Sequence, residues 1–263
     1  MSESLVERLV LLGLVQPGEP VVADTATVAA LLAAAPHEGT VALLGAAIDA
    51  GAVVVDDESR SSVEAAWTET MARCVQLDIL LCSVSQRLAA AGVHHRVLKG
   101  AAVATLDEMQ PAWRSYSDVD VLVPDGSLMA AVRVLAAGEL RPIVQPVSER
   151  WAERHAKSLT LVAPDGTQVD LHRQLAPGVF GERLQLGVLF HGGAAVALGG
   201  AEVLALDAPH RFLHACYHAS LGGVRGARHR RDILLLARSV TVGELAGRWA
   251  EGWSPTVVAD SLQ

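Results

Sequence analysis

The chain has 263 residues, of which 51% are hydrophobic and 19% are charged, a composition that excludes a disordered polypeptide and allows a large hydrophobic core. Acidic residues outnumber basic ones by 29 to 21, giving a net charge of −8, which argues against a broad, sequence-independent clamp for nucleic acid phosphates. The three cysteines have no close CxxC spacing, so we expect neither a disulfide framework nor a thiolate zinc site.

No segment of the sequence predicts a membrane contact. The N-terminus lacks the basic start and the long apolar run of a signal peptide. The longest uncharged stretch, Leu184–Ala201, has the length of a membrane span but contains five glycines, and we interpret it as buried strand and turn. Because the cysteines suggest no disulfide, the reducing cytoplasm is the expected compartment.

The pattern of the sequence changes twice, which predicts three regions. Residues 1–60 combine alanine-rich helical segments with turns, and the role of this mostly helical region is open. Residues 61–200 alternate helical and strand patterns, whereas residues 201–263 are dominated by helical spacing. We therefore expect an α/β (α+β) protein in which a small mixed β-sheet is flanked by N-terminal and C-terminal helices.

The spacing of apolar residues predicts the elements of the central region. Between Ser61 and Ala91 these residues recur every three or four positions, which indicates one long amphipathic helix. Short strands and helices follow. We expect strands at Val93–Leu98 and Asp118–Val123, helices at Gly100–Leu106 and Leu128–Ala137, and a β-hairpin made by Ser158–Ala163 and Gln168–Leu175. Asp207, before Ala208-Pro209, predicts the cap of a further helix.

Two carboxylates lie on one face of the strand Asp118–Val123. Asp118 and Asp120 are two residues apart, so their side chains leave the same face of the strand, while the intervening valine points the other way. Two acids that project together from an apolar strand repel each other and lose hydration unless a cation lies between them. A divalent metal ion would relieve both effects.

Asp170 repeats this pattern in the second strand of the predicted hairpin, where it lies between Val169 and Leu171. If this strand pairs beside the one that carries Asp118 and Asp120, three carboxylates converge. Such a set of hard oxygen ligands suits one or two Mg²⁺ ions, with Mn²⁺ as an alternative. The opposing interpretation is that these acids cap turns or pair with arginines, as most isolated aspartates near strand ends do.

One of the two lysines in the chain, Lys99, ends the strand that precedes the acid pair, and Gly100 follows it at the start of the next helix. Backbone N–H groups at a helix start attract phosphate, and a glycine permits close approach of the ligand. Lys99 and Gly100 are therefore candidates for binding a phosphate group. The alternative is a lysine exposed to solvent at the end of a strand.

Taken in order, these segments resemble a known family. Residues 97–101 (VLKGA), 114–123 (RSYSDVDVLV) and 169–172 (VDLH) are similar to motifs of the uncharacterised nucleotidyltransferase family within the polymerase-β-like superfamily. A helical tail like that of residues 212–237 also belongs to the family, and the resemblance covers about residues 61–240. Order and spacing together carry the resemblance, since each motif alone is weak.

The resemblance implies a roughly three-layer α/β core in which Asp118 and Asp120 bind metal and the triphosphate, while Asp170 completes the metal site. Lys99 and Arg114 would neutralise charge on the polyphosphate. The wider superfamily usually opens its phosphate helix with a Gly-Ser or Gly-Gly pair. In this chain Lys99-Gly100 replaces that pair, and the gap to the acid pair is longer.

The function expected from this resemblance is Mg²⁺-dependent transfer of a nucleoside monophosphate from a nucleoside triphosphate to an acceptor, with release of pyrophosphate. Asp170 would also act as general base. The acceptor, whether small molecule, peptide or RNA end, and the preferred base are open. A catalytically silent relative that serves as a binding or antitoxin-like module is the alternative from another class, and a toxin that modifies an RNA end would share the chemistry.

Three weaker features remain. His172 points to the same face as Asp170 and is a candidate for binding a ligand or orienting the carboxylate; the alternative is a structural hydrogen-bond donor on a half-buried strand. His214 and His218 have a spacing that suits zinc, but without a clear third ligand we favour hydrogen bonding between helices. A local basic run is expected either to touch phosphate or to form a solvated helix face on which Asp232 pairs with an arginine; it consists of Arg225, Arg228, His229, Arg230 and Arg231.

Overall fold

The computed structural model describes residues 3–16, 18–222 and 226–263. Its strands are β1 (Val21–Val22), β2 (Val53–Val54), β3 (Arg96–Val97), β4 (Asp118–Leu122), β5 (Arg141–Pro142), β6 (Ser158–Val162), β7 (Gln168–His172), β8 (Ala194–Leu198) and β9 (Ala201–Ala205). Its α-helices are α1 (Glu3–Val10), α2 (Thr25–Glu38), α3 (Val41–Asp49), α4 (Asp57–Ala90), α5 (Gly100–Leu106), α6 (Leu128–Ala136), α7 (Glu149–His155), α8 (Gly178–Glu182), α9 (Ala208–Leu221), α10 (Ala227–Ala237), α11 (Val242–Arg248) and α12 (Pro255–Ser261). Short 3₁₀ helices lie at Pro111–Trp113, Leu186–Phe190 and Trp249–Glu251.

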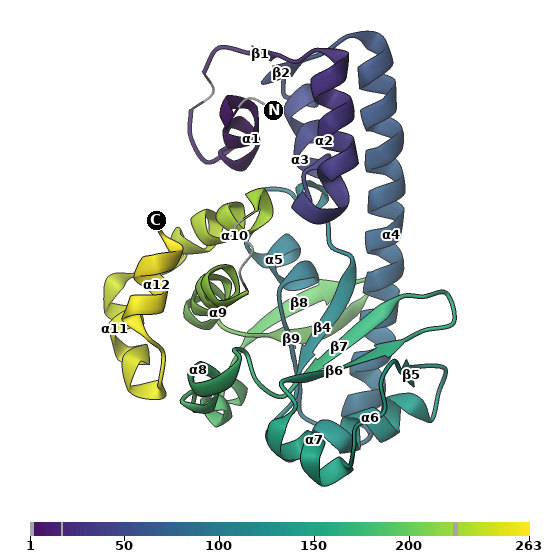
Figure 1. The fold of residues 1–263 in the computed structure, drawn as a ribbon, viewed down its shortest axis with the longest axis vertical. Coiled ribbons are helices and arrows are strands. Elements are labelled where there is room, and N and C mark those ends of the chain that lie inside the picture. Colours follow the sequence, from purple (N-terminus) through teal and green to yellow (C-terminus); the bar gives the residue numbers. More distant parts are fainter. Residues whose placement is uncertain (1–2, 17, 223–225) are drawn as a thin grey trace.

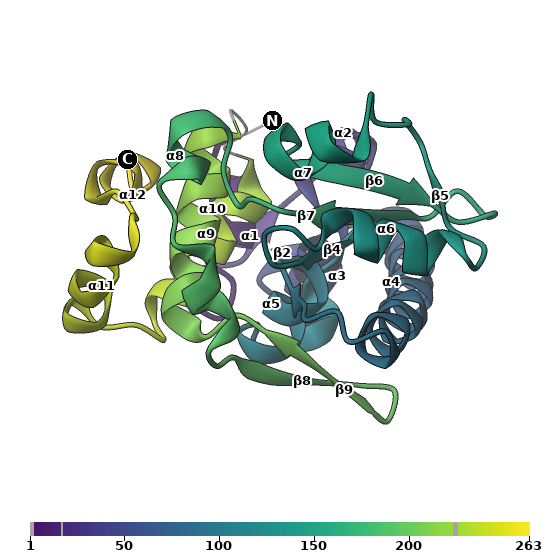
Figure 2. The same ribbon diagram turned by 90° about the horizontal axis from the view of Figure 1, so that it is seen from below.

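A seven-stranded mixed sheet with the strand order β5-β6-β7-β4-β3-β9-β8 forms the centre of the fold, as Figure 1 shows. Strand β4 pairs in parallel with β7 and antiparallel to β3. The expected mixed α/β architecture and the pairing of the hairpin strand beside β4 are therefore confirmed. In Figure 2 the hairpin β8–β9 lies at the edge of the molecule, and its buried side chains join the core to which α4 contributes.

Strand β4 separates two hydrophobic cores. Val119 and Val121 pack in a core to which α4 and α6 contribute, whereas Leu122 belongs to a core built with α9, α10 and α12. Because side chains alternate along a strand, Asp118 and Asp120 share the face of Leu122. The acids therefore lie on the side of the sheet that the C-terminal helices cover.

The N-terminal helices form a third core with the beginning of α4. This core is tied to the C-terminal helices by Arg231 of α10, whose guanidinium donates to the carbonyls of Val10 and Leu12. The same guanidinium forms a buried ion pair with Glu108 at 2.6 Å. Removal of this arginine would leave the Glu108 carboxylate buried without its counter-ion and two carbonyls without this donor.

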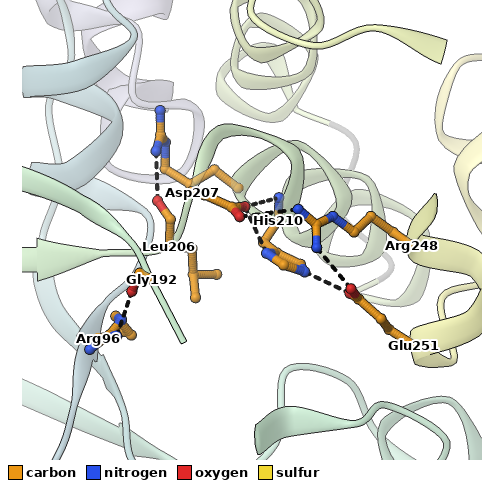
Figure 3. A network of polar contacts seen from close by, with 8 residues as sticks. Arg96, Gly192, Leu206, Asp207, His210, Arg248 and Glu251 are labelled. Carbon is orange, nitrogen blue, oxygen red and sulfur yellow. Dashed lines mark hydrogen bonds and ion pairs between the residues drawn. The ribbon is translucent and has the colours of Figure 1, made fainter. Parts of the chain in front are cut away.

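At the start of α9 the predicted cap is confirmed, since the Asp207 side chain accepts a hydrogen bond from the backbone N–H of His210. Figure 3 shows how this end of the helix is joined to the C-terminal region. His210 lies between two carboxylates, with Nδ1 2.7 Å from Asp207 and Nε2 2.8 Å from Glu251. Arg248 also contacts both acids. The network fixes the 3₁₀ turn at Glu251 against α9.

Several element boundaries differ from those expected. The strand predicted at Val93–Leu98 is only two residues long. Its first residues belong to the turn that ends α4, because the backbone N–H of Val93 donates to the carbonyl of Leu88. The sheet also extends to Ala205 through β9. Leu184–Ala201 contains a 3₁₀ helix as well as β8. In the described part of the chain no helix combines the length and the apolar character needed to cross a bilayer.

Candidate active site

The register of the sheet brings the two predicted acid positions together. Asp120 of β4 lies directly opposite Asp170 of β7 in the parallel pair. On the other side of β7, Thr160 of β6 lies opposite Asp170 and donates a hydrogen bond of 2.5 Å to its Oδ1. Three neighbouring strands therefore fix the position of the Asp170 carboxylate.

Asp120 is almost completely buried, with 4% of its surface exposed. Its Oδ1 lies 2.8 Å from the ammonium of Lys99 and 2.7 Å from Nε2 of His172. Burial acts to raise the pKa of Asp120, but the hydrogen bond from His172 and the charge of Lys99 outweigh it and hold the pKa far below its usual range. Asp120 is therefore a fixed negative charge in the interior.

Asp118 lies closer to solvent on the same face of β4 and is half-buried. Burial raises its pKa, and the negative charges of Asp120 and Asp170 act in the same direction, while Lys99 opposes them. The repulsion inferred from the sequence is therefore a feature of the folded protein. A bound cation beside these acids would reduce it.

A metal ion fits this donor set at three residues. One ligand atom each from Asp120, Asp170 and His172 lie within 4.8 Å of one another, and this is the one group of its kind among the described residues. The carboxylate oxygens suit Mg²⁺ or Mn²⁺, and the imidazole suits Mn²⁺ better than Mg²⁺. Asp118 is not part of the group, although its charge is coupled to both acids.

Lys99 reaches Asp120 from an unusual backbone conformation. Its φ of 45° and ψ of −122° make it the one non-glycine residue with positive φ in the described ranges. This conformation turns the chain sharply from β3 into α5, and a residue with a Cβ adopts it at a cost of about 1–3 kcal/mol. The strain is retained where it places an ammonium group on a buried carboxylate.

Gly100 begins α5, as expected, and lies against the ring of Tyr116. A Cβ at this position would lie 3.0 Å from Cγ of Tyr116, so a larger residue would have to push the ring away by a few tenths of an ångström. The Tyr116 hydroxyl in turn donates to Asp78 of α4 at 2.5 Å. Gly100 also lines the cavity beside the acids.

Arg114 and Asp232 form a buried, bidentate ion pair. Nε and one terminal nitrogen of Arg114 each lie 2.8 Å from an oxygen of Asp232, and the remaining terminal nitrogen donates to the Ser115 carbonyl at 2.6 Å. All three nitrogens of the guanidinium expected near the polyphosphate are thus engaged within the protein. The expected pairing of Asp232 with an arginine is confirmed, but the solvated helix face expected with it is wrong, because His229, Arg231 and Asp232 are buried.

A cavity of about 150 Å³ opens beside the carboxylates, between β3, β4 and the helices α9 and α10. Lys99, Asp118 and Asp120 line it, together with residues from the C-terminal helices such as His214 and His218. A second, larger hollow of about 720 Å³ lies between the N-terminal helices and α4, and both hollows are lined by Tyr116, Ser117 and Arg228.

His214 and His218 lie outside the metal-compatible group. Burial lowers the pKa of His218 to about 3, with the positive charge of Lys99 acting in the same direction. Burial and Lys99 also hold the pKa of His214 well below its usual range. The ring of His218 faces that of His229 with centroids 4.8 Å apart. The two cavity-lining histidines are therefore neutral, polar groups at neutral pH.

Sequence reasoning missed Thr160 and Lys157 as parts of the site. Lys157 as a whole is exposed, but its ammonium is partly buried. This burial and the charge of Lys99 lower the pKa of Lys157, and the opposing charges of Asp120 and Asp170 do not fully offset them. Both lysines of the chain thus lie within electrostatic reach of the acids. The scarcity of lysine was a signal that could have indicated Lys157. Arg225 of the basic run lies outside the described residues.

Comparison with known proteins places these features in a family. Residues 24–243 match the family described as "Uncharacterised nucleotidyltransferase". The chain belongs to this family. The resemblance noted in the sequence is therefore confirmed, and the family match extends further toward the N-terminus than expected. A comparison with curated proteins finds no match.

Three solved structures are similar to part of this chain. A crystal structure of ANT(2″)-Ia in complex with adenylyl-2″-tobramycin has 12% identity and a TM-score of 0.46, and the alignment covers 70% of this chain and 95% of that one. A solution structure of ANT(2″)-Ia has 12% identity, a TM-score of 0.44 and coverages of 70% and 91%. A nucleotidyltransferase-like protein from Paracoccidioides brasiliensis has 15% identity, a TM-score of 0.42 and coverages of 71% and 91%.

Proposed function

We propose that this member of the family is a Mg²⁺-dependent nucleotidyltransferase that transfers a nucleoside monophosphate from a nucleoside triphosphate to an acceptor and releases pyrophosphate. The main support is the alignment of Asp120 with Asp170 across β4 and β7, beside a cavity that Lys99 and Asp118 also line. Family membership supports the reaction class.

In this proposal Asp120 and Asp170, two of the three residues whose ligand atoms converge, would hold the metal, and Asp118 on the same face of β4 would join them as a further ligand. Bound Mg²⁺, or Mn²⁺ in its place, would supply positive charge that lowers the pKa of the acceptor hydroxyl and offsets charge on the phosphates. His172 keeps the Asp120 carboxylate oriented through the bond to Oδ1. Lys99 adds a positive charge for the phosphates at the start of α5, and Gly100 lets Tyr116 pack closely against that turn.

The transfer itself needs one base and one leaving group. The acceptor oxygen forms a bond to the α-phosphorus, the bond from this phosphorus to the bridging oxygen breaks, and pyrophosphate leaves with the electron pair. Asp170 takes the hydroxyl proton. Its Oδ1 is held by Thr160, which leaves Oδ2 for the proton.

The reaction is tested by incubating the protein with labelled nucleoside triphosphates and candidate acceptors, and by measuring how Mg²⁺–nucleotide binds to the wild type and to Asp118→Asn/Asp120→Asn. The amide removes the charge and nearly keeps the volume, so packing is preserved. We expect the double variant to lose metal-dependent binding. Identical affinities in the two proteins would contradict the proposal.

The alternative is a catalytically silent module in which the acids only pair with nearby cations. The ion pair between Lys99 and Asp120 is the observation in its favour, because it occupies the most buried carboxylate of the group. A titration with Mn²⁺ separates the two functions. A silent module would show no Mn²⁺ site that depends on Asp120 and Asp170.

A further inference from the structure

Among the described arginines of the basic run, residues 228, 230 and 231, Arg228 alone lines the cavity beside the acids. It lies in the first turn of α10, at the place where the cavity beside the acids and the larger hollow meet, and it lines both. Residues 228, 231 and 232 share one face of this helix because of its period of 3.6 residues. Arg230 is exposed on another side of the helix.

The two other buried arginines near Arg228 are fully engaged within the protein. Arg231 binds Glu108 and two backbone carbonyls, and Arg114 binds Asp232. Arg228 is half-buried, yet it makes no hydrogen bond and no ion pair within 4.0 Å with any residue that the structure describes. Its guanidinium is thus a partly desolvated cation without a direct partner in the described part of the chain.

Packing holds the aliphatic part of the Arg228 side chain in place, whereas no hydrogen bond to a described residue holds its guanidinium. Gly39, at the end of α2, packs against the side chain so closely that a Cβ there would lie 2.9 Å from Cδ of Arg228. This contact holds the methylenes between the N-terminal helices and α10. The guanidinium is therefore presented at the junction of the two hollows, and its orientation does not depend on an acidic partner.

The surrounding charges explain what such a group can bind. Arg114 repels Arg228, while Asp118, Asp120 and Asp232 attract it from beyond ion-pair distance. A partly buried cation loses hydration. An anionic ligand with oxygen acceptors compensates for this loss through charge-assisted, often bidentate hydrogen bonds. Phosphate oxygens match the planar fork of a guanidinium.

We propose that Arg228 binds a phosphate group of the nucleotide directly, and that Arg114 acts only as a positioning residue that holds α10 through Asp232. This inference rests on the proposed function, because it concerns the donor of the same cavity. It assigns the contact to a residue other than the Arg114 expected from the sequence, since the three guanidinium nitrogens of Arg114 already bond to Asp232 and to the Ser115 carbonyl.

Calorimetric titrations of the full chain test the assignment with two probes: a non-hydrolysable ATP analogue with Mg²⁺, and inorganic tripolyphosphate without metal. The variants are Arg228→Gln, Arg228→Lys and, as a matched control on the exposed side of α10, Arg230→Gln. We expect Arg228→Gln to weaken the binding of both probes by about 10- to 100-fold, the range for hydrogen bonds to charged groups. Arg228→Lys should retain part of the affinity, and Arg230→Gln should match the wild type.

The thermal unfolding midpoint provides an independent readout. Because Arg228 has no partner that would be left unpaired, Arg228→Gln should unfold at the same temperature as the wild type or higher. A lowered midpoint would show that the arginine serves folding and would overturn the assignment, as would unchanged affinity for both probes.

The two probes also separate this inference from the proposed function. If the wild type binds tripolyphosphate through Arg228 but does not bind the Mg²⁺–ATP analogue, the anion site stands and the proposed function fails. If the wild type binds the analogue and Arg228→Gln binds it equally well, the proposed function stands and Arg228 has no role in it. Binding of neither probe would refute both.

Discussion

The ammonium of Lys99 lies 2.8 Å from Oδ1 of Asp120, and the backbone at Lys99 is held at a φ of 45° to place it there. The ion pair thus combines a buried carboxylate with a strained turn between β3 and α5. Strain of this kind persists where the surrounding structure, here a parallel strand pair and a close-packed tyrosine, over-determines the conformation. The charge of Lys99 and the backbone strain at Lys99 therefore affect stability in two ways that substitutions can separate.

Two substitutions of Lys99 separate these effects. Lys99→Ala and Lys99→Gly both remove the ammonium from Asp120, and each should lower the free energy of unfolding by about 3 kcal/mol or more, because a buried carboxylate loses a partner. Lys99→Gly should be the more stable variant by about 1 kcal/mol, because glycine adopts positive φ without strain. Urea unfolding of both variants measures the difference, and a more stable alanine variant would contradict the strain.

Gly100→Ala tests the close packing of the Tyr116 ring. The added Cβ would lie 3.0 Å from Cγ of the ring, so the variant should be about 1–3 kcal/mol less stable than the wild type. Gly187→Ala is the control, since nothing lies within 4 Å of its added Cβ. In a double-mutant cycle, the cost of Gly100→Ala should largely disappear in a Tyr116→Ala background; an undiminished cost would place the clash elsewhere.

The ion pair of Arg114 with Asp232 should behave as a buried, structural pair. Arg114→Met and Asp232→Leu alone should each lower the free energy of unfolding by about 3–5 kcal/mol, because the remaining charge stays buried without its partner. The double variant should recover most of this loss. Chemical denaturation of the three variants measures the coupling, and additive losses would show that the two side chains act independently.

Stability should fall in acid through the network around His210. Burial acts to raise the pKa values of Asp207 and Glu251, but hydrogen bonds from His210 outweigh it and lower both. A lowered pKa in the folded state means that these acids contribute stability above their unfolded pKa values, about 4, and lose it as the pH falls through the folded values. Thermal midpoints measured from pH 6 down to about pH 3 should decline less steeply for Glu251→Gln than for the wild type; parallel curves would exclude a contribution of Glu251.

Asp170→Asn tests the proposed base without disturbing the fold. The amide keeps the position opposite Asp120 and can still accept a hydrogen bond from Thr160. We expect turnover with labelled nucleotide and a competent acceptor to fall by about 10²- to 10⁴-fold, the usual contribution of general acid–base catalysis. Thr160→Val, which leaves the carboxylate in place, should have a smaller effect. Equal activities of Asp170→Asn and the wild type would exclude this base.

Much of the architecture follows from the sequence by itself. Apolar spacing indicates α4, α5 and α6, and the turn residues between Val162 and Gln168 indicate the hairpin, because these signals are local and act within a few residues. The period of two along Asp118–Val123 is enough to place both acids on one face of the strand. The same local chemistry predicts Asp207 as a helix cap.

Only the tertiary structure decided which charged side chains pair with each other and which stay available for a ligand. Arg114 and Arg228 are both arginines near the acids. Asp232, more than a hundred residues from Arg114, pairs with Arg114, whereas Arg228 has no direct partner within residues 3–16, 18–222 and 226–263. The register that aligns Asp120 with Asp170 likewise depends on a pairing between distant strands. The pairing depends on packing between segments far apart in the chain, because burial sets the free energy of each charged group. A local sequence pattern does not indicate how deeply a group will be buried.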